Sequence, residues 1–251
     1  MGISKTTDLA TIYREKAGYY YQFTRTELID LLPKNRVFAN VLEVGASGGY
    51  TLLYLKTKGI AKKVTGIELF ELAGTEQQNP QLDAFTIGNI EQMEEAIFLP
   101  GEFDLVICGD VLEHLQNPWA VRDKIITWLK PGGFLLASIP NIREYKTVLK
   151  ILLRGTFTYE EGGIMDKTHL RFFGKGNILE LLGTNGLHIE KIVSNLAYPV
   201  WNTKTRATVN RLTFKIFEEF LAKQYFVLAV KKSESRKVGE SERQKVGKTE
   251  S

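Results

Sequence analysis

The stretch Val41-Leu42-Glu43-Val44-Gly45-Ala46-Ser47-Gly48-Gly49-Tyr50 decides the fold class of this chain. It predicts a short buried strand that carries an acid, then a glycine-rich turn, then the start of a helix at residues 51–55. Glycines let the backbone turn tightly and approach a ligand, because no Cβ stands in the way. The N–H groups at the start of the following helix point to the same place. In an alternating β/α chain, such a unit is where an open parallel sheet usually binds its cofactor.

The next strand, expected at residues 63–69, carries a second acid, Glu68, near its end. Its distance from Glu43 in the sequence is 68 − 43 = 25 residues, which fits one β-α-β step. A carboxylate at the tip of this strand can accept hydrogen bonds from both hydroxyls of a ribose. NAD and S-adenosylmethionine both carry that ribose. The dinucleotide fingerprint is incomplete here, because Tyr50 stands where its third glycine belongs.

The order acid-x-Gly-x-small-x-Gly, formed by Glu43, Gly45, Ser47 and Gly49, resembles motif I of the class I S-adenosylmethionine-dependent methyltransferases. Ser47 stands where the family usually has glycine. Two later segments extend the resemblance: Phe-Asp-Leu-Val with Asp-Val-Leu-Glu-His-Leu over 103–115, and Leu-Lys-Pro-Gly-Gly over 129–133. This combination of motif I with the two later segments is not expected in a dehydrogenase. The segment His-Leu-Arg-Phe-Phe at 169–173 is similar to one in a branch that methylates saccharides and secondary metabolites.

The resemblance implies an α/β fold, a Rossmann-like open sheet of seven strands with helices on both faces. The sheet should be mostly parallel, with an antiparallel last strand inserted beside the sixth. We expect one methyltransferase domain over 1–232 and a disordered tail over 233–251. Residues 1–40 should form an N-terminal helical cap with a helix up to Leu32, and two basic segments, 141–177 and 197–222, should cover the substrate. A single helix is expected over 205–222.

The resemblance also assigns a cofactor site for S-adenosylmethionine, which becomes S-adenosylhomocysteine after transfer. The family usually has Gly-Asp after the third strand, where this chain has Gly88-Asn89, so a neutral side chain would meet the adenine amino group. The implied cofactor-binding residues are Glu43, Gly45, Ala46, Ser47, Gly49, Glu68, Leu69, Asn89, Ile90 and Asp110.

Methyl transfer to a hydroxyl needs alignment of the two reactants and a base. The chain has three histidines, and His188 follows a turn in an expected strand, which favours a structural role. His114 follows the fourth strand, where the active site should open. His169 lies in the covering segment beside Asp166, which could orient it. His169, His114 and Asp166 are therefore the candidate catalytic residues, against an alternative in which Asp166, His169 and Arg171 only fix a loop.

The net charge and the motifs that are missing from the sequence argue against several other functions. The formal net charge of +4 permits an anionic substrate but is small for a nucleic-acid binder. No Asn/Asp-Pro-Pro-aromatic motif follows the fourth strand, which argues against methylation of a nucleic-acid base amine, and no Cys/His cluster has zinc spacing, so no metal is expected. Cys108 is expected in the core. No apolar run approaches the length of a membrane span, so we expect a cytoplasmic protein with at most a peripheral membrane surface.

Three hypotheses follow for the function. The chain is predicted to methylate a small-molecule acceptor, through an oxygen of a sugar, a polysaccharide precursor or a secondary metabolite. The basic helices leave open an RNA or protein methyltransferase, or a surface that meets a lipid-linked substrate. A cofactor-binding homologue without activity is the third. The acceptor and the oligomeric state cannot be read from these residues.

Overall fold

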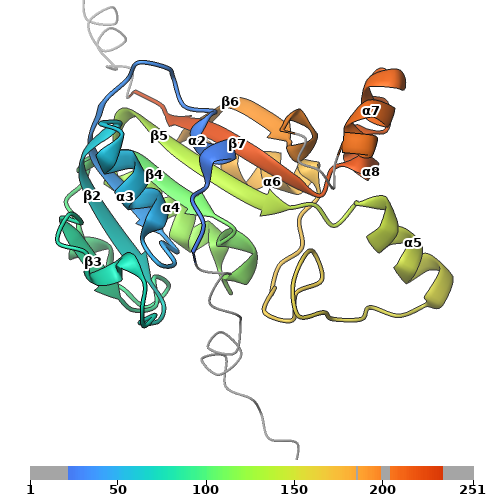
Figure 1. The fold of residues 1–251 in the computed structure, drawn as a ribbon, viewed down its shortest axis with the longest axis horizontal. Helices are drawn as coiled ribbons and strands as arrows, with labels where there is room; N and C mark the ends of the chain where they lie inside the picture. Colours follow the sequence, from blue (N-terminus) through green and yellow to red (C-terminus); the bar gives the residue numbers. More distant parts are fainter. Residues whose placement is uncertain (1–21, 185, 199–203, 234–251) are drawn as a thin grey trace, which may run out of the picture.

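A computed structural model of the protein describes residues 22–184, 186–198 and 204–233. Seven strands form one sheet in the order β3-β2-β1-β4-β5-β7-β6 (Figure 1). The pairs among β1 to β5 are parallel, whereas β7 runs antiparallel to both β5 and β6. This confirms the predicted Rossmann-like sheet with its inserted last strand. The strands are β1 Phe38–Val44, β2 Ala61–Glu68, β3 Ala84–Ile87, β4 Phe103–Gly109, β5 Leu129–Pro140, β6 Leu187–Ser194 and β7 Gln224–Lys231.

The two faces of the sheet bury separate clusters, because successive side chains of a strand point to opposite faces. On one face, Val41 and Leu105 pack with the helices α2 Thr26–Ile29 and α3 Tyr50–Thr57. On the other, Leu42 and Val106 pack with α4 Pro118–Trp128 and α6 Lys175–Leu182. The central strands β1 and β4 are therefore almost wholly apolar. Cys108 of β4 is buried and reduced, as expected from the sequence.

Helix α4 begins with two residues that are suited to a helix start. The side chain of Asn117 accepts a hydrogen bond from the N–H of Ala120, and Pro118 occupies the first turn. These two features satisfy or remove N–H groups that have no partner within the helix. The helix then connects β4 to β5, which keeps these two strands parallel and neighbours.

Two expected helices are shorter than predicted. Helix α2 ends at Ile29 instead of Leu32, and its N-cap residue makes no capping hydrogen bond through its side chain. The single helix expected over 205–222 is two helices, α7 Lys204–Leu212 and α8 Glu218–Leu221. Between them Phe214 and Lys215 have positive φ, and this left-handed backbone cannot continue a right-handed helix.

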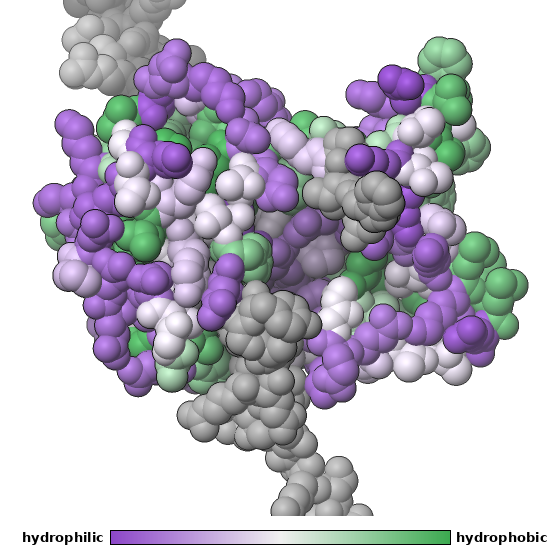
Figure 2. All heavy atoms as spheres, viewed as in Figure 1, coloured by the Kyte–Doolittle hydropathy of each residue, from purple (hydrophilic) through white to green (hydrophobic). Residues whose placement is uncertain are grey.

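The segments predicted to cover the substrate lie at one side of the sheet. Helix α5 Tyr145–Arg154 and the chain after it extend from the end of β5, with α7 and α8 beside them (Figure 1). Apolar side chains are exposed at the surface of this region (Figure 2), with Leu152, Leu153, Leu212, Phe214 and Ile216 the most exposed. No helix among the described residues is long and apolar enough to cross a membrane. Most of the predicted N-terminal cap, residues 1–21, and the predicted tail after Ser233 lie outside the described residues.

Candidate active site

The glycine-rich loop leaves the end of β1 in a left-handed conformation. Gly45, Ser47 and Gly49 have φ values of 67°, 52° and 84°. A Cβ at Gly45 would lie 2.4 Å from Cγ2 of Val111, so this position requires glycine for space as well as for φ. Ser47 stands where the methyltransferase motif usually has glycine. Its backbone adopts the same left-handed region, at a cost of about 1–2 kcal/mol for a non-glycine residue.

Glu68 connects the loop to the tip of β2. Its Oε2 accepts from the N–H of Ser47 and its Oε1 from the N–H of Leu69, both at 2.7 Å. Burial raises the pKa of Glu68, and hydrogen bonds from the N–H groups of Leu69, Ser47 and Phe70 oppose this rise. A carboxylate has about four lone-pair positions, so Glu68 can accept a further hydrogen bond. A ribose hydroxyl of the cofactor fits this requirement.

A cavity of about 280 Å³ lies at this edge of the sheet. Seven of the ten predicted cofactor residues line it, namely Gly45, Ser47, Glu68, Leu69, Asn89, Ile90 and Asp110. The other three support the loop from behind: Glu43 and Ala46 are buried, and Gly49 is the N-cap of α3. Apolar side chains, among them Ile67 and Leu115, provide surfaces against which a nucleoside ring can pack. The residues present therefore fit S-adenosylmethionine.

The sequence did not reveal a role for Arg25. Its guanidinium lies in the wall of this cavity and forms an ion pair with Oδ2 of Asp110. The other oxygen of Asp110, Oδ1, accepts from Ser138 and Gln224. Residues from three distant parts of the chain thus fix Asp110 at the tip of β4. No spacing rule in the sequence relates Arg25 to β4.

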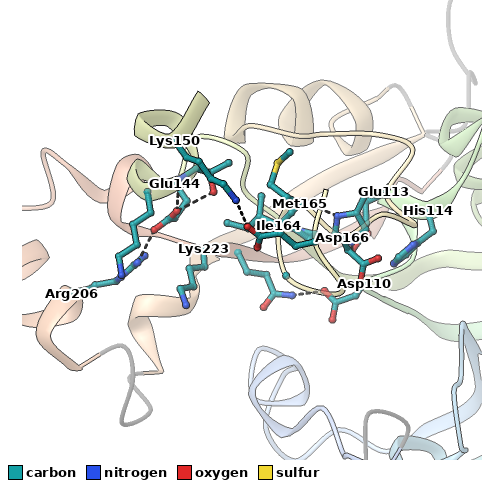
Figure 3. A pocket seen from close by; sticks show the side chains of 17 residues that line it. Asp110, Glu113, His114, Glu144, Lys150, Ile164, Met165, Asp166, Arg206 and Lys223 are labelled. Carbon is teal, nitrogen blue, oxygen red and sulfur yellow. Dashed lines mark hydrogen bonds and ion pairs between the residues drawn. The ribbon is translucent and has the colours of Figure 1, made fainter. Parts of the chain in front are cut away.

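A second cavity, of about 520 Å³, adjoins the first, and Asp110 and His114 line both. Its walls come from η4 Leu112–His114, from α5, from the chain over 160–169 and from Arg206 and Lys223 (Figure 3). Asp110, Glu113 and His114 lie at one end in Figure 3, and Glu144, Arg206 and Lys223 lie at the other. The buried carboxylate of Glu144 and the guanidinium of Arg206 form an ion pair at 2.7 Å.

All three candidate catalytic residues line this second cavity. Nδ1 of His114 lies 3.1 Å from the carbonyl oxygen of Thr168, and Nδ1 of His169 lies 3.0 Å from that of Ile164. Because a carbonyl oxygen only accepts, both Nδ1 atoms are donors and both Nε2 atoms carry the lone pair in neutral rings. Oδ1 of Asp166 accepts from the N–H and hydroxyl of Thr168 and so holds the turn that precedes His169.

Glu113 completes a cluster with the two histidines. The rings of His114 and His169 are 4.7 Å apart, and Nε2 of His169 is 4.0 Å from Oε1 of Glu113. Burial, and after it the charge of Asp110, raises the pKa of Glu113 well above its usual range. In the sequence, Glu113 stands out only as part of the Asp-Val-Leu-Glu-His-Leu motif. Its proximity to His169, 56 residues later, depends on how the covering segment folds back.

The methyltransferase domain family matches residues 13–192 of this chain, which is well over half of its length. The chain belongs to this family. It is 29% identical over 171 residues to a ubiquinone biosynthesis O-methyltransferase of Colwellia psychrerythraea, which covers 62% of this chain and 66% of the relative. A protein of the same name from Albidiferax ferrireducens is 32% identical over 161 residues, which cover 59% of this chain and 62% of that relative. The chain thus spans about two thirds of the length of these relatives.

Solved structures agree on the fold. An S-adenosylmethionine-dependent methyltransferase of Mesorhizobium loti superposes with a TM-score of 0.56 at 16% identity, covering 86% of this chain and 99% of that one. Phosphoethanolamine N-methyltransferase 2 of Haemonchus contortus, in complex with S-adenosylmethionine, superposes with a TM-score of 0.55 at 14% identity. The match covers 83% of this chain and 52% of that one. With the family match, this makes the protein an S-adenosylmethionine-dependent methyltransferase, and S-adenosylmethionine is its cofactor.

Proposed function

We propose that this methyltransferase acts on a hydroxyl oxygen of a polar small molecule, of the sugar, polysaccharide-precursor or secondary-metabolite class. The observation that carries the proposal is that the second cavity adjoins the cofactor cavity at Asp110 and His114. An acceptor bound there would place its hydroxyl beside the cofactor's methyl group. The O-methyltransferases among the relatives support oxygen as the methylated atom.

The lining of the second cavity suits an acceptor with many hydroxyls. Charges of both signs face it, including Glu144, Lys150, Arg206 and Lys223. Carboxylates accept and ammonium and guanidinium groups donate, so a polyhydroxylated molecule can find a partner for each hydroxyl. A purely apolar acceptor would exclude water from these charged groups without replacing its hydrogen bonds, which costs free energy.

The bound cofactor supplies a methyl group activated by a sulfonium. The acceptor oxygen forms a bond to the methyl carbon, the carbon–sulfur bond breaks with its electron pair on sulfur, and the hydroxyl proton leaves. We assign His114 and His169 a part in the activation of that hydroxyl, because both rings line the acceptor cavity and their Nε2 atoms carry the lone pairs. Asp166 is assigned as a positioning residue through its turn.

The test is transfer of a labelled methyl group to a panel of acceptors. Sugar nucleotides, glycosides and phenolic metabolites would be compared with total RNA and with a protein extract. We expect label on a hydroxylated small molecule, released by treatments that cleave ethers. Label on RNA or protein alone would contradict the proposal, as would S-adenosylmethionine binding with no turnover across the panel.

The cofactor site is tested by calorimetric titration of S-adenosylmethionine into wild type and Glu68→Ala. Hydrogen bonds to a charged group are worth about 1.5–3 kcal/mol each, so losing one or two should weaken binding at least tenfold. Glu71→Ala is the matched control, since Glu71 is an exposed acid three residues further on. Equal affinities in the two variants would mean that Glu68 does not hold the ribose.

A lipid-linked acceptor is the second candidate, favoured by the exposed apolar side chains near the acceptor cavity. Phe214 and Ile216 are 88% and 75% exposed, and the basic side chains of Arg211 and Lys215 lie beside them in the chain. Such a surface suits the interface of an anionic bilayer. Sedimentation with phosphatidylglycerol vesicles should be lost in Phe214→Ser/Ile216→Ser. It should persist in Leu99→Ser, and equal binding by all three proteins would exclude this surface.

A further inference from the structure

The cluster of Glu113, His114 and His169 has the composition of a metal site. One ligand atom from each residue can be chosen so that all three atoms lie within 4.8 Å of one another. Two imidazoles and one carboxylate are a common set of protein ligands for divalent transition metals, with further coordination positions left open for a substrate. The sequence prediction of no metal considered only sequence spacing, which does not bring His169 to the other two.

Each imidazole is oriented as a metal ligand would be. The Nδ1 atoms of His114 and His169 face the carbonyl oxygens of Thr168 and Ile164. Metal-binding histidines almost always donate their other ring N–H to a carbonyl or a carboxylate, which fixes the ring and directs the second nitrogen to the metal. The same contact with Thr168 ties the two histidine-bearing segments together.

The backbone holds these segments in register as well. The carbonyl oxygen of Glu113 accepts from the N–H of Leu170 at 2.8 Å and from that of Arg171 at 2.9 Å. These bonds fix the chain around His169 directly against η4, which carries Glu113 and His114. The three side chains are therefore brought together by the fold and do not depend on the conformation of a free loop.

The burial of the Glu113 carboxylate is a second, independent observation that points to a bound cation. Its side chain is 1% exposed, and among the described residues neither carboxylate oxygen has a hydrogen-bond partner. A buried polar group without a partner is destabilising, and proteins rarely retain one without a ligand or a functional reason. Asp110 and Asp166 add negative charge around it, and Arg25, the nearby cation, is paired with Asp110.

We propose that Glu113, His114 and His169 bind a divalent transition-metal cation of the zinc or cobalt type at the wall of the acceptor cavity. With metal–ligand distances of about 2.0–2.2 Å, the ligand atoms would be about 3–3.5 Å apart. The 4.0 Å between His169 Nε2 and Glu113 Oε1 must shorten accordingly on binding. Binding of the cation does not depend on the identity of the acceptor.

The role of the cation in catalysis rests on the proposed function. Bound to the acceptor oxygen, it would lower the pKa of that hydroxyl, as zinc does for bound water. The hydroxyl proton would pass to water, and the two imidazoles would serve as ligands instead of proton acceptors. The cation therefore replaces a general base and also positions the oxygen beside the methyl group.

The test is cobalt and zinc titration of the full chain after removal of metals with a chelator. We expect one Co²⁺ per chain with visible d–d absorption, displaced by Zn²⁺. Binding should be at least tenfold weaker in Glu113→Gln and in His169→Ala. His188→Ala is the matched control, because His188 is the one other histidine of the chain and lies exposed on β6.

Thermal denaturation provides a second measurement. Glu113→Gln keeps the shape of the side chain, so without metal it should melt near the wild type, and Zn²⁺ should raise the midpoint of the wild type alone. Equal cobalt binding in wild type and Glu113→Gln, or binding lost only in His188→Ala, would overturn the metal site. If the metal-free protein still transfers the methyl group in the presence of a chelator, the role of the cation is refuted and the proposed function stands. If the protein binds the metal but methylates no acceptor, the proposed function is refuted and the metal site stands.

Discussion

Glu43 should make the stability of this protein fall as pH rises through neutrality, and Glu43→Gln should remove that effect. The side chain lies in β1, 1% exposed, and Oε2 has no hydrogen-bond partner among the described residues. Burial raises the pKa of Glu43 from 4.5 to about 8, with the charge of Glu68 adding to the rise and that of Arg25 opposing it. At pH 7 the folded protein therefore holds this proton, while the unfolded chain releases it.

The magnitude follows from linkage. Between pH 4.5 and pH 8 the folded state binds one proton more than the unfolded state, so the free energy of unfolding decreases by up to about 1.4 kcal/mol per pH unit. The contribution is fully present below pH 4.5 and is lost as pH approaches 8. The two pKa values differ by 8 − 4.5 = 3.5, which corresponds to about 5 kcal/mol over the whole range. From pH 5.5 to 7.5 the expected loss is about 2–3 kcal/mol.

Glutamine is neutral at every pH and nearly isosteric with the protonated acid. Urea unfolding at pH 5.5, 6.5 and 7.5 should therefore show Glu43→Gln gaining about 2–3 kcal/mol relative to wild type across the series. Other acids titrate in both proteins, so the difference between the two isolates Glu43. Glu71→Gln, the same change at an exposed position, should run parallel to wild type. Parallel curves for Glu43→Gln would show that Glu43 is ionised in the fold and refute the reasoning.

Three further substitutions test the loop, the ion pair and the helix cap. Gly45→Ala places a Cβ 2.4 Å from Val111 at a φ of 67°, so S-adenosylmethionine affinity and the melting temperature should both fall, and unchanged affinity would argue against a close backbone approach to the cofactor. Arg25→Ala leaves Asp110 without its cationic partner; urea unfolding should show a loss of about 1–3 kcal/mol and calorimetry a weaker cofactor, whereas full retention of both would remove Arg25 from the site. Asn117→Ala should lower stability by about 1 kcal/mol without altering cofactor affinity, and an altered affinity would contradict a purely local cap.

Much of the candidate cofactor cavity was predictable because its position follows from local rules applied at one edge of the sheet. Parallel strands joined by helices end at the same edge, so residues after β1, β2, β3 and β4 converge without any knowledge of packing. Gly45, Glu68, Asn89 and Asp110 accordingly line one cavity. Helix lengths were less predictable. Phe214 and Lys215 fit the apolar and basic pattern of a helix, and only their left-handed backbone separates α7 from α8.

The sequence by itself determined the parallel β/α part of the sheet and the edge at which the candidate cofactor cavity lies, because these depend on hydrophobic periodicity and on glycine and acid positions within short segments. The antiparallel strand beside the sixth was predicted from the resemblance. Only the tertiary structure decided that Arg25 pairs with Asp110, 85 residues later, and that Glu113 and His114 meet His169. Such contacts depend on how irregular segments fold back over the sheet. Their backbone hydrogen bonds, such as those from Leu170 and Arg171 to Glu113, leave no periodic trace in the sequence.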